Sequence, residues 1–132
     1  IAAIHVGWKG AFKNILKKCI KFMIKKGSKN QNISAVIGPS IFRENYEVKR
    51  DFMKKFLNLS SRNRKFFYFK KTKIFFDLKE FIKSQLRSLK IRNIDIINKD
   101  TFKNRSEFFS ARRALKNKED DYGRNISIIM LK

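Results

Sequence analysis

The 132-residue sequence contains one histidine, one cysteine and one proline, and it is poor in acidic residues. A zinc site takes at least three ligands from the protein, so His5 and Cys19 cannot build one by themselves. A single cysteine cannot form an internal disulfide, which favours a reducing compartment, the cytoplasm. Lysines interrupt every apolar run before it reaches the about 18 residues of a membrane span. These absences predict a soluble, cytoplasmic protein without a membrane partner.

Basic residues are abundant instead: 33 of them give the chain a formal charge of +22 at pH 7. A field of this sign attracts polyanions such as nucleic acid. The lysines, however, are spread over the whole chain beside many Ile, Asn and Phe residues, which is what an A/T-rich coding sequence produces without selection for binding. Composition therefore disfavours nucleic acid as a partner.

The apolar residues recur with periods that predict alternating strands and helices. We expect strands at 2–6, 33–37, 66–69, 74–76, 94–97 and 126–131, and helices at 12–23, 48–57 and 78–89. Gly27 follows the first helix, where a left-handed residue commonly ends a helix. The pattern contains no repeat or linker and predicts one α/β domain over residues 1–132, with a long polar connection at 98–122.

Two short stretches carry the candidate functional residues. His5 ends a predicted strand before Gly7-Trp8-Lys9-Gly10, a junction where α/β folds commonly face a ligand, although a lone histidine there is also commonly structural. The glycine spacing is not that of a phosphate-binding loop. Arg112 and Arg113 lie in the polar connection, and guanidinium groups suit phosphate or carboxylate, but a solvated pair fits as well.

The run 62–71 places cations on both sides of four consecutive aromatic residues. This combination can bind single-stranded nucleic acid, with bases stacked on the rings and phosphates paired with the cations. Such a module would bind in a salt-sensitive way and would lose affinity when Phe67 or Tyr68 is replaced by Ala. The same run also describes a buried strand flanked by protective lysines, the interpretation that we favour.

Three ordered stretches resemble one family. They are Ile4-His5-Val6-Gly7-Trp8-Lys9-Gly10; Ile37-Gly38-Pro39-Ser40-Ile41 leading to Tyr46-Glu47-Val48; and Phe108-Phe109-Ser110-Ala111-Arg112-Arg113 with Gly123-Arg124-Asn125-Ile126-Ser127. Together they resemble the laccase-domain family, first called polyphenol oxidase or multicopper-oxidase-like and now regarded as purine nucleoside phosphorylases. These enzymes also deaminate adenosine and cleave methylthioadenosine.

The resemblance implies an α/β sandwich with a mixed sheet, of which residues 1–132 are the C-terminal part, incomplete at the N-terminus. It implies purine nucleosides and phosphate as partners, and zinc, with copper as the alternative, as the metal. His5 corresponds to a metal ligand and catalytic residue of the family. Gly7, Trp8, Lys9 and Gly10 would form the floor of the substrate site. From their charge we expect a catalytic role for Arg112 and a substrate-binding role for Arg113. The sequence does not indicate the oligomeric state.

Some positions depart from the family pattern. Ser40 stands where many members have cysteine, Phe42 replaces a usual glycine, and Asp100 with Thr101 replaces a frequent cysteine-threonine pair. The family's other histidine and its ligand cysteine have no counterpart here. Two further hypotheses therefore remain beside the enzyme, a basic nucleic-acid-binding module and an inactive remnant of the family.

Overall fold

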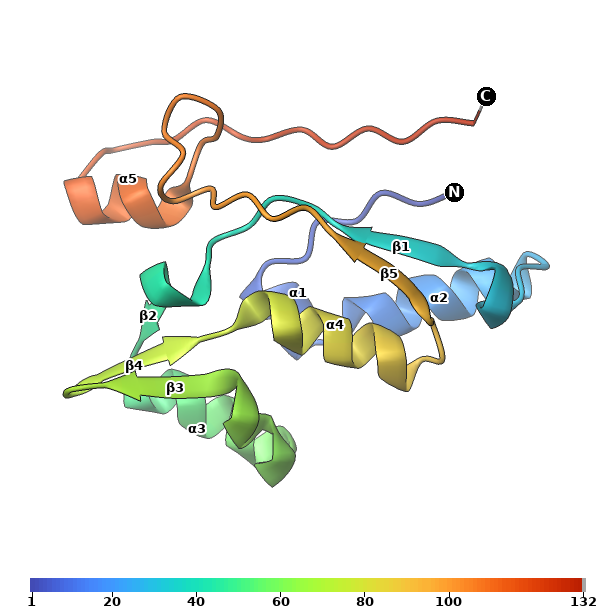
Figure 1. Cartoon of the computed structure of the whole chain (residues 1–132), viewed down its shortest axis with the longest axis horizontal. Helices are drawn as coiled ribbons and strands as arrows, with labels where there is room; N and C mark the ends of the chain where they lie inside the picture. Colours follow the sequence, from blue (N-terminus) through green and yellow to red (C-terminus); the bar gives the residue numbers. More distant parts are fainter. Residues whose placement is uncertain (132) are drawn as a thin grey trace. The chain divides into compact units, whose positions relative to one another are not determined.

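The computed structural model describes residues 1–131, which form a mixed α/β structure (Figure 1). The helices are α1 (Trp8–Phe12), α2 (Ile15–Lys25), α3 (Arg50–Leu59), α4 (Leu78–Ser88) and α5 (Ala111–Asn117). The strands are β1 (Ser34–Ile37), β2 (Glu47–Val48), β3 (Phe67–Lys70), β4 (Lys73–Phe76) and β5 (Asn93–Ile96). The chain is thus α/β, as predicted. It divides into two compact units: unit 1 comprises residues 1–38, 80–97 and the segment from Ser127, and unit 2 comprises 39–79 and 98–126.

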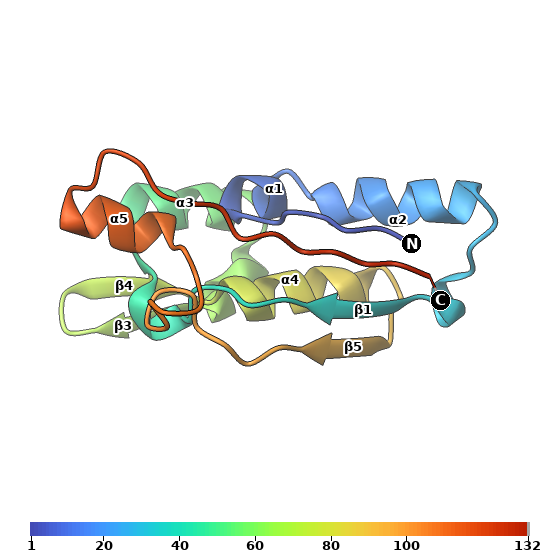
Figure 2. The same ribbon diagram turned by 90° about the horizontal axis from the view of Figure 1, so that it is seen from above.

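Unit 1 is built on a parallel pair of strands, β1 and β5, which lie side by side in Figure 2. Parallel neighbours need a long crossover between them rather than a tight turn. Residues Leu16 and Ile20 of α2 and Leu86 of α4 are buried in this unit. The side-chain amide of Gln85 donates a hydrogen bond of 2.8 Å to the carbonyl of Ala11, which joins α4 to α1.

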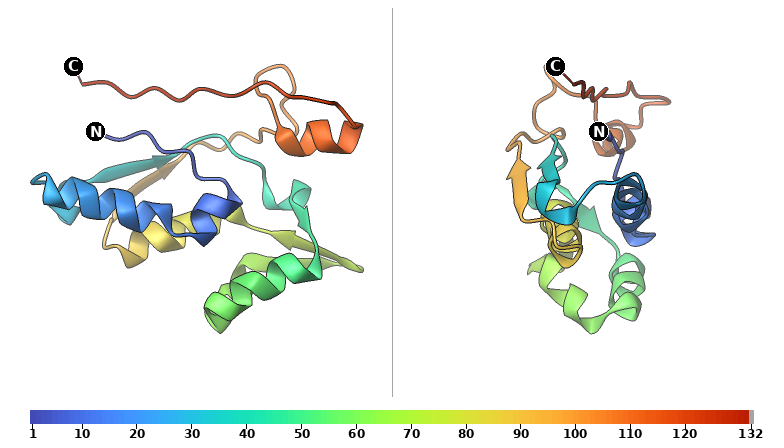
Figure 3. Two further views of the ribbon diagram at one scale, coloured as in Figure 1. Left: turned by 180° about the vertical axis from the view of Figure 1, so that it is seen from behind. Right: turned by 90° about the vertical axis from the view of Figure 1, so that its right-hand side faces the viewer.

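Unit 2 contains an antiparallel sheet in the order β2-β4-β3. The hairpin of β3 and β4 and the neighbouring helix α3 are seen from behind in Figure 3. Phe67 of β3 pairs with Phe76 of β4, so both rings lie on one face of the sheet. Phe56 of α3 packs against this face, with its ring centroid 4.8 Å from that of Phe76 and 6.0 Å from that of Phe67. These rings form the core of unit 2.

Most of the predicted interior elements are confirmed: β1, β3, β4, β5, α3 and α4 lie where the periodicity placed them. Gly27 has the expected positive φ, 97°, after α2. The predicted first helix is interrupted by Asn14, which has a left-handed φ of 53°. Its first part, α1, begins at Trp8, so Lys9 and Gly10 are helical and do not form the predicted loop.

The predicted strands at 2–6 and 126–131 are wrong. Both segments lack strand pairing, and Ile126 is 85 % exposed. A strand needs hydrogen bonds from a neighbouring backbone, and no other segment within residues 1–131 supplies them here. The apolar composition from which these strands were predicted does not show whether a neighbouring strand is present.

The role of the aromatic core of unit 2 can be tested on α3. Phe56 is 0 % exposed, whereas Leu59 on the same helix is 53 % exposed. We expect Phe56→Ala to lower the free energy of unfolding by about 3–5 kcal/mol, because it removes buried apolar contacts and leaves a cavity. Urea denaturation followed by circular dichroism measures this. Leu59→Ala is the matched control and should cost less than about 1 kcal/mol; an equal loss for both variants would contradict this core.

Candidate functional site

The histidine and glycine motif lies at the start of α1, in unit 1. A Cβ added to Gly7 would lie 3.2 Å from Nε2 of His5, so the imidazole of His5 is folded back over this glycine. A Cβ on Gly10 would lie 3.4 Å from the side chain of Ile15 and 3.7 Å from the carbonyl oxygen of His5. The glycines therefore leave room for the exposed His5 side chain and for the turn between α1 and α2.

Trp8 and Lys9 form the first turn of the same helix. Trp8 is half-buried, and the ammonium of Lys9 lies 5.8 Å from the centre of its ring. Gly7 precedes the helix, and its carbonyl accepts a hydrogen bond of 2.9 Å from the backbone NH of Ala11. This motif thus places one aromatic residue, one cation and one imidazole within six positions of the chain.

The two arginines lie on α5, in unit 2, where no helix was predicted. Ser110 caps this helix, because its hydroxyl accepts a hydrogen bond from the backbone NH of Arg113. Adjacent residues of a helix point about 100° apart, so Arg112 and Arg113 leave the helix in different directions. Their surroundings differ accordingly.

Arg113 holds the polar connection that precedes α5. Its Nη1 donates to the carbonyls of Thr101 at 2.8 Å and Phe102 at 2.9 Å, and its Nη2 donates to the carbonyl of Phe108 at 2.6 Å. A planar guanidinium presents its donors as a fixed fork, so these bonds fix the segment against the helix. Substrate binding by Arg113 remains a prediction, since most of its donors serve this segment.

Arg112 faces the segment around β2. Its Nη1 donates a hydrogen bond of 2.9 Å to the carbonyl of Glu47, and its guanidinium carbon lies 5.0 Å from the centre of the Tyr46 ring. Tyr46 is 7 % exposed, and this burial raises the pKa of its phenol, while the positive charge of Arg112 acts in the opposite direction. Arg112 is therefore a half-buried cation stacked on a buried ring.

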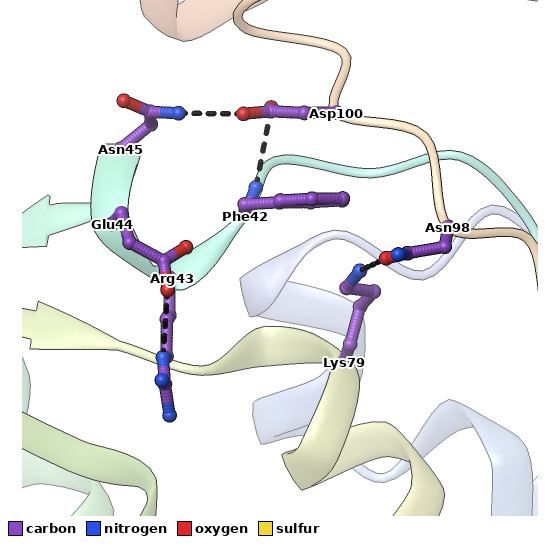
Figure 4. A network of polar contacts seen from close by, with 7 residues as sticks. All are labelled: Phe42, Arg43, Glu44, Asn45, Lys79, Asn98 and Asp100. Atoms are coloured by element: carbon purple, nitrogen blue, oxygen red, sulfur yellow. Dashed lines mark hydrogen bonds and ion pairs between the residues drawn. The ribbon is translucent and has the colours of Figure 1, made fainter.

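A buried carboxylate connects the segments that contact both arginines (Figure 4). Asp100 is 4 % exposed. Its oxygens accept hydrogen bonds from the backbone NH of Phe42 at 3.3 Å, the backbone NH of Phe102 at 2.8 Å and the side-chain amide of Asn45 at 2.5 Å. These bonds fix Asn45, which precedes Tyr46, and Phe102, whose carbonyl binds Arg113.

In the third sequence motif, residues 123–127 contact Phe109 through Gly123 and Asn125. The side chain of Asn125 accepts a hydrogen bond from the backbone NH of Phe109 and donates one to its carbonyl, at 2.9 and 2.8 Å. A Cβ on Gly123 would lie 2.5 Å from the Phe109 ring, so any other residue at this position would require that ring to move. The hydrogen bonds between Asn125 and Phe109 fix the chain after α5 to the residue two positions before this helix.

The described residues do not supply a metal site. Within residues 1–131 no group of three or more His, Cys, Asp or Glu side chains is close enough to hold an ion. Zinc needs at least three protein ligands, so the residues present do not fit the metal that the family resemblance implies. His5 therefore remains a predicted ligand, with no partner ligand among these residues.

In the same part of the chain, residues 1–131, no helix has the length and apolar character needed to cross a membrane.

The aromatic run 62–71 does not form a stacking platform. Phe66 and Phe67 are buried, but Phe66 precedes β3 and the other residues of that strand are exposed, so the predicted buried strand is confirmed only at Phe67. Tyr68 and Phe69 are exposed, but they are adjacent on β3 and therefore point to opposite faces of the sheet. Arg43 lies over the ring of Tyr68 and Arg64 over that of Phe69. One nucleic-acid strand cannot stack on both faces.

These features define an α/β protein with an arginine stacked on a tyrosine in one unit and a histidine-glycine motif in the other. The family described as multi-copper polyphenol oxidoreductase laccase matches residues 1–132, and the chain belongs to this family.

Several curated relatives are similar to the chain. A purine nucleoside phosphorylase of Rickettsia conorii is 36 % identical over 100 % of this chain and 55 % of its own length. One from Rickettsia prowazekii is 37 % identical over 86 % of the chain and 48 % of its own length. One from Campylobacter jejuni is 35 % identical over 100 % of the chain and 54 % of its own length. The chain thus spans about half the length of these relatives.

Tyr46, which contacts Arg112, and Asp100, which fixes the segments around both arginines, are not among the site residues predicted from the sequence. In the sequence Tyr46 stands out only as part of a motif, and Asp100 only as a departure from the family pattern. A buried Asp in a chain that carries few acidic residues gives no periodic signal, because its burial depends on donors more than 50 positions away. The Tyr46-Glu47-Val48 motif was the one available indication.

Replacement of Arg113 tests its role in holding the polar connection. We expect Arg113→Gln to lower the free energy of unfolding by about 2 kcal/mol, because an amide cannot replace a charged fork that binds carbonyls of Thr101, Phe102 and Phe108. The midpoint of urea unfolding reports the loss. Arg105→Gln removes the same charge from an exposed side chain and should stay within about 0.5 kcal/mol of the wild type. If both variants match the wild type, Arg113 does not hold this segment.

Proposed function

We propose that this chain contributes to a purine nucleoside phosphorylase, which transfers the ribosyl group of a purine nucleoside to phosphate. The observation that carries the proposal is the family match over residues 1–132, together with the names of the relatives. Adenosine deamination, methylthioadenosine cleavage and a cytoplasmic location, as expected from the sequence, belong to the same proposal.

Arg112 is the group that we assign to phosphate. Its half-buried guanidinium can make paired hydrogen bonds to two oxygens of a phosphate, and its charge favours the dianion. In phosphorolysis an oxygen of phosphate forms a bond to C1′ of the ribose while the bond from C1′ to the purine nitrogen breaks. The purine leaves with the electron pair of that bond and takes up a proton. Arg112 would orient the phosphate for this attack.

As the family resemblance implies, we assign Gly7, Trp8, Lys9 and Gly10 of unit 1 to the substrate, as a proposal separate from that for Arg112 in unit 2. The ring of Trp8 is half-buried, and the ammonium of Lys9 lies over it. Gly7 and Gly10 leave room for the side chains of His5 and Ile15, which lie against them. His5 is assigned as one ligand of a zinc ion, with copper as the alternative; such an ion supplies a Lewis acid where it is bound. No step of the proposed reaction is assigned to it here, because the described residues do not complete its site.

An inosine assay tests this function. The purified protein that carries this sequence, supplied with zinc, should release hypoxanthine from inosine only when phosphate is present. We expect Arg112→Gln to lower this rate by about 10²-fold, the usual effect of removing one donor to a reacting anion. Arg105→Gln should retain the rate. A folded protein that binds no metal and leaves inosine unchanged with phosphate present would contradict the proposal and favour an inactive remnant.

A further inference from the structure

We infer that Tyr46 is a positioning residue, whose buried ring and following carbonyl hold the Arg112 guanidinium ready for a phosphate-class anion. The inference rests on the role proposed for Arg112 and adds Tyr46 as the residue that fixes the position of its guanidinium. Tyr46 itself is not expected to touch the substrate.

The ring of Tyr46 is fixed by the aromatic core of unit 2. Its centroid lies 6.0 Å from that of Phe76, in an edge-to-face arrangement, and 6.3 Å from that of Phe52. The carbonyl of Tyr46 accepts a hydrogen bond of 3.1 Å from the backbone NH of Phe76. Asn45, one position earlier, is bound by the buried carboxylate of Asp100. Contacts on the ring and on both sides of the backbone therefore prevent Tyr46 from moving away.

This fixed ring restricts Arg112. The guanidinium carbon lies 5.0 Å from the ring centre, within the range of a cation–π contact, and Nη1 is bound to the carbonyl of Glu47. A guanidinium carries five N–H donors; one binds the carbonyl of Glu47 and another binds the hydroxyl of Tyr46, so further donors remain for an anion. Arg113, by contrast, makes three bonds to backbone carbonyls. A long side chain that is already ordered loses less freedom when it binds a ligand, which favours anion binding by Arg112.

Phosphate titration of the chain tests this inference. Inorganic phosphate would be added to ¹⁵N-labelled protein, and the Nε–Hε signal of Arg112 would be followed by NMR. We expect Tyr46→Leu to bind phosphate about tenfold more weakly than the wild type. Tyr46→Phe keeps the ring face but loses the hydrogen bond between the hydroxyl and Arg112, so it should bind more tightly than Tyr46→Leu. Tyr68→Leu is the matched control, since it removes a ring that stacks on Arg43 at a similar distance, 5.3 Å. It should leave phosphate binding unchanged.

The outcomes separate this inference from the proposed function. If Arg112→Gln binds phosphate as tightly as the wild type, the role of Arg112 fails, and the role of Tyr46 fails with it. If Arg112→Gln loses binding but Tyr46→Leu keeps it, the positioning role alone is overturned. Weaker binding by Tyr46→Leu with recovery in Tyr46→Phe supports it.

A second measurement uses a substitution of Arg112, which lies outside the aromatic core. It therefore tests the inference even if Tyr46→Leu fails to fold. Burial raises the pKa of the Tyr46 phenol, and the charge and hydrogen bond of Arg112 act against this rise. Arg112→Gln should therefore raise this pKa relative to the wild type, as measured by the absorbance of tyrosinate on alkaline titration. The same Tyr46 pKa in the wild type and in Arg112→Gln would show that the guanidinium does not rest against the ring, and would overturn the inference.

Discussion

The buried carboxylate of Asp100 is the constraint on which unit 2 depends. It accepts hydrogen bonds from Phe42, Asn45 and Phe102, which belong to two segments far apart in the sequence. A carboxylate removed from water is stable only when donors surround it, so the two segments must meet in this arrangement for Asp100 to be buried. In a chain with a formal charge of +22, the surrounding field also favours a buried anion over a buried cation.

Both arginines of α5 depend on this arrangement, and they use it differently. Arg113 binds carbonyls of the segment that Asp100 fixes at Phe102. Arg112 stacks on Tyr46, which follows the Asn45 that Asp100 binds. Arg113 thus stabilises the fold. Arg112 is held in place by the fold and can bind an anion. The charges in the sequence alone do not distinguish the contacts of Arg112 from those of Arg113.

The sequence predicted the parts of the fold that depend on local periodicity. The apolar spacing of α3 and α4 indicates one buried face on each helix, and the structure confirms both helices. The aromatic run predicts a strand at β3, which the structure also confirms, with Phe67 as its buried residue. It did not predict α5, because the helix is short, and it holds only one fully buried side chain, that of Ala114. Residues 126–131 show the opposite error: their composition is that of a strand, but pairing depends on a second backbone that local sequence does not describe.

The sequence predicted which residues belong to the candidate site, but not which contacts they make. Their charge selected Arg112 and Arg113, and the family resemblance selected His5 with the following glycines, but the tertiary fold sets the partners of these residues. Tyr46 lies 66 positions before Arg112, and Asp100 lies 58 positions after Phe42. Contacts over such separations leave no periodic trace in a single sequence, so their identification needs the structure.

Hydrogen exchange after the replacement Asp100→Leu tests the central claim most directly, that this carboxylate holds unit 2 together. The change keeps a similar size and removes every acceptor. The account predicts that the backbone amides of Phe42 and Phe102 both exchange at least about tenfold faster, which corresponds to a loss of about 1.4 kcal/mol. The amides of the β1 and β5 ladder in unit 1 serve as the internal reference and should keep their rates. Unchanged protection at Phe42 and Phe102 would contradict the account.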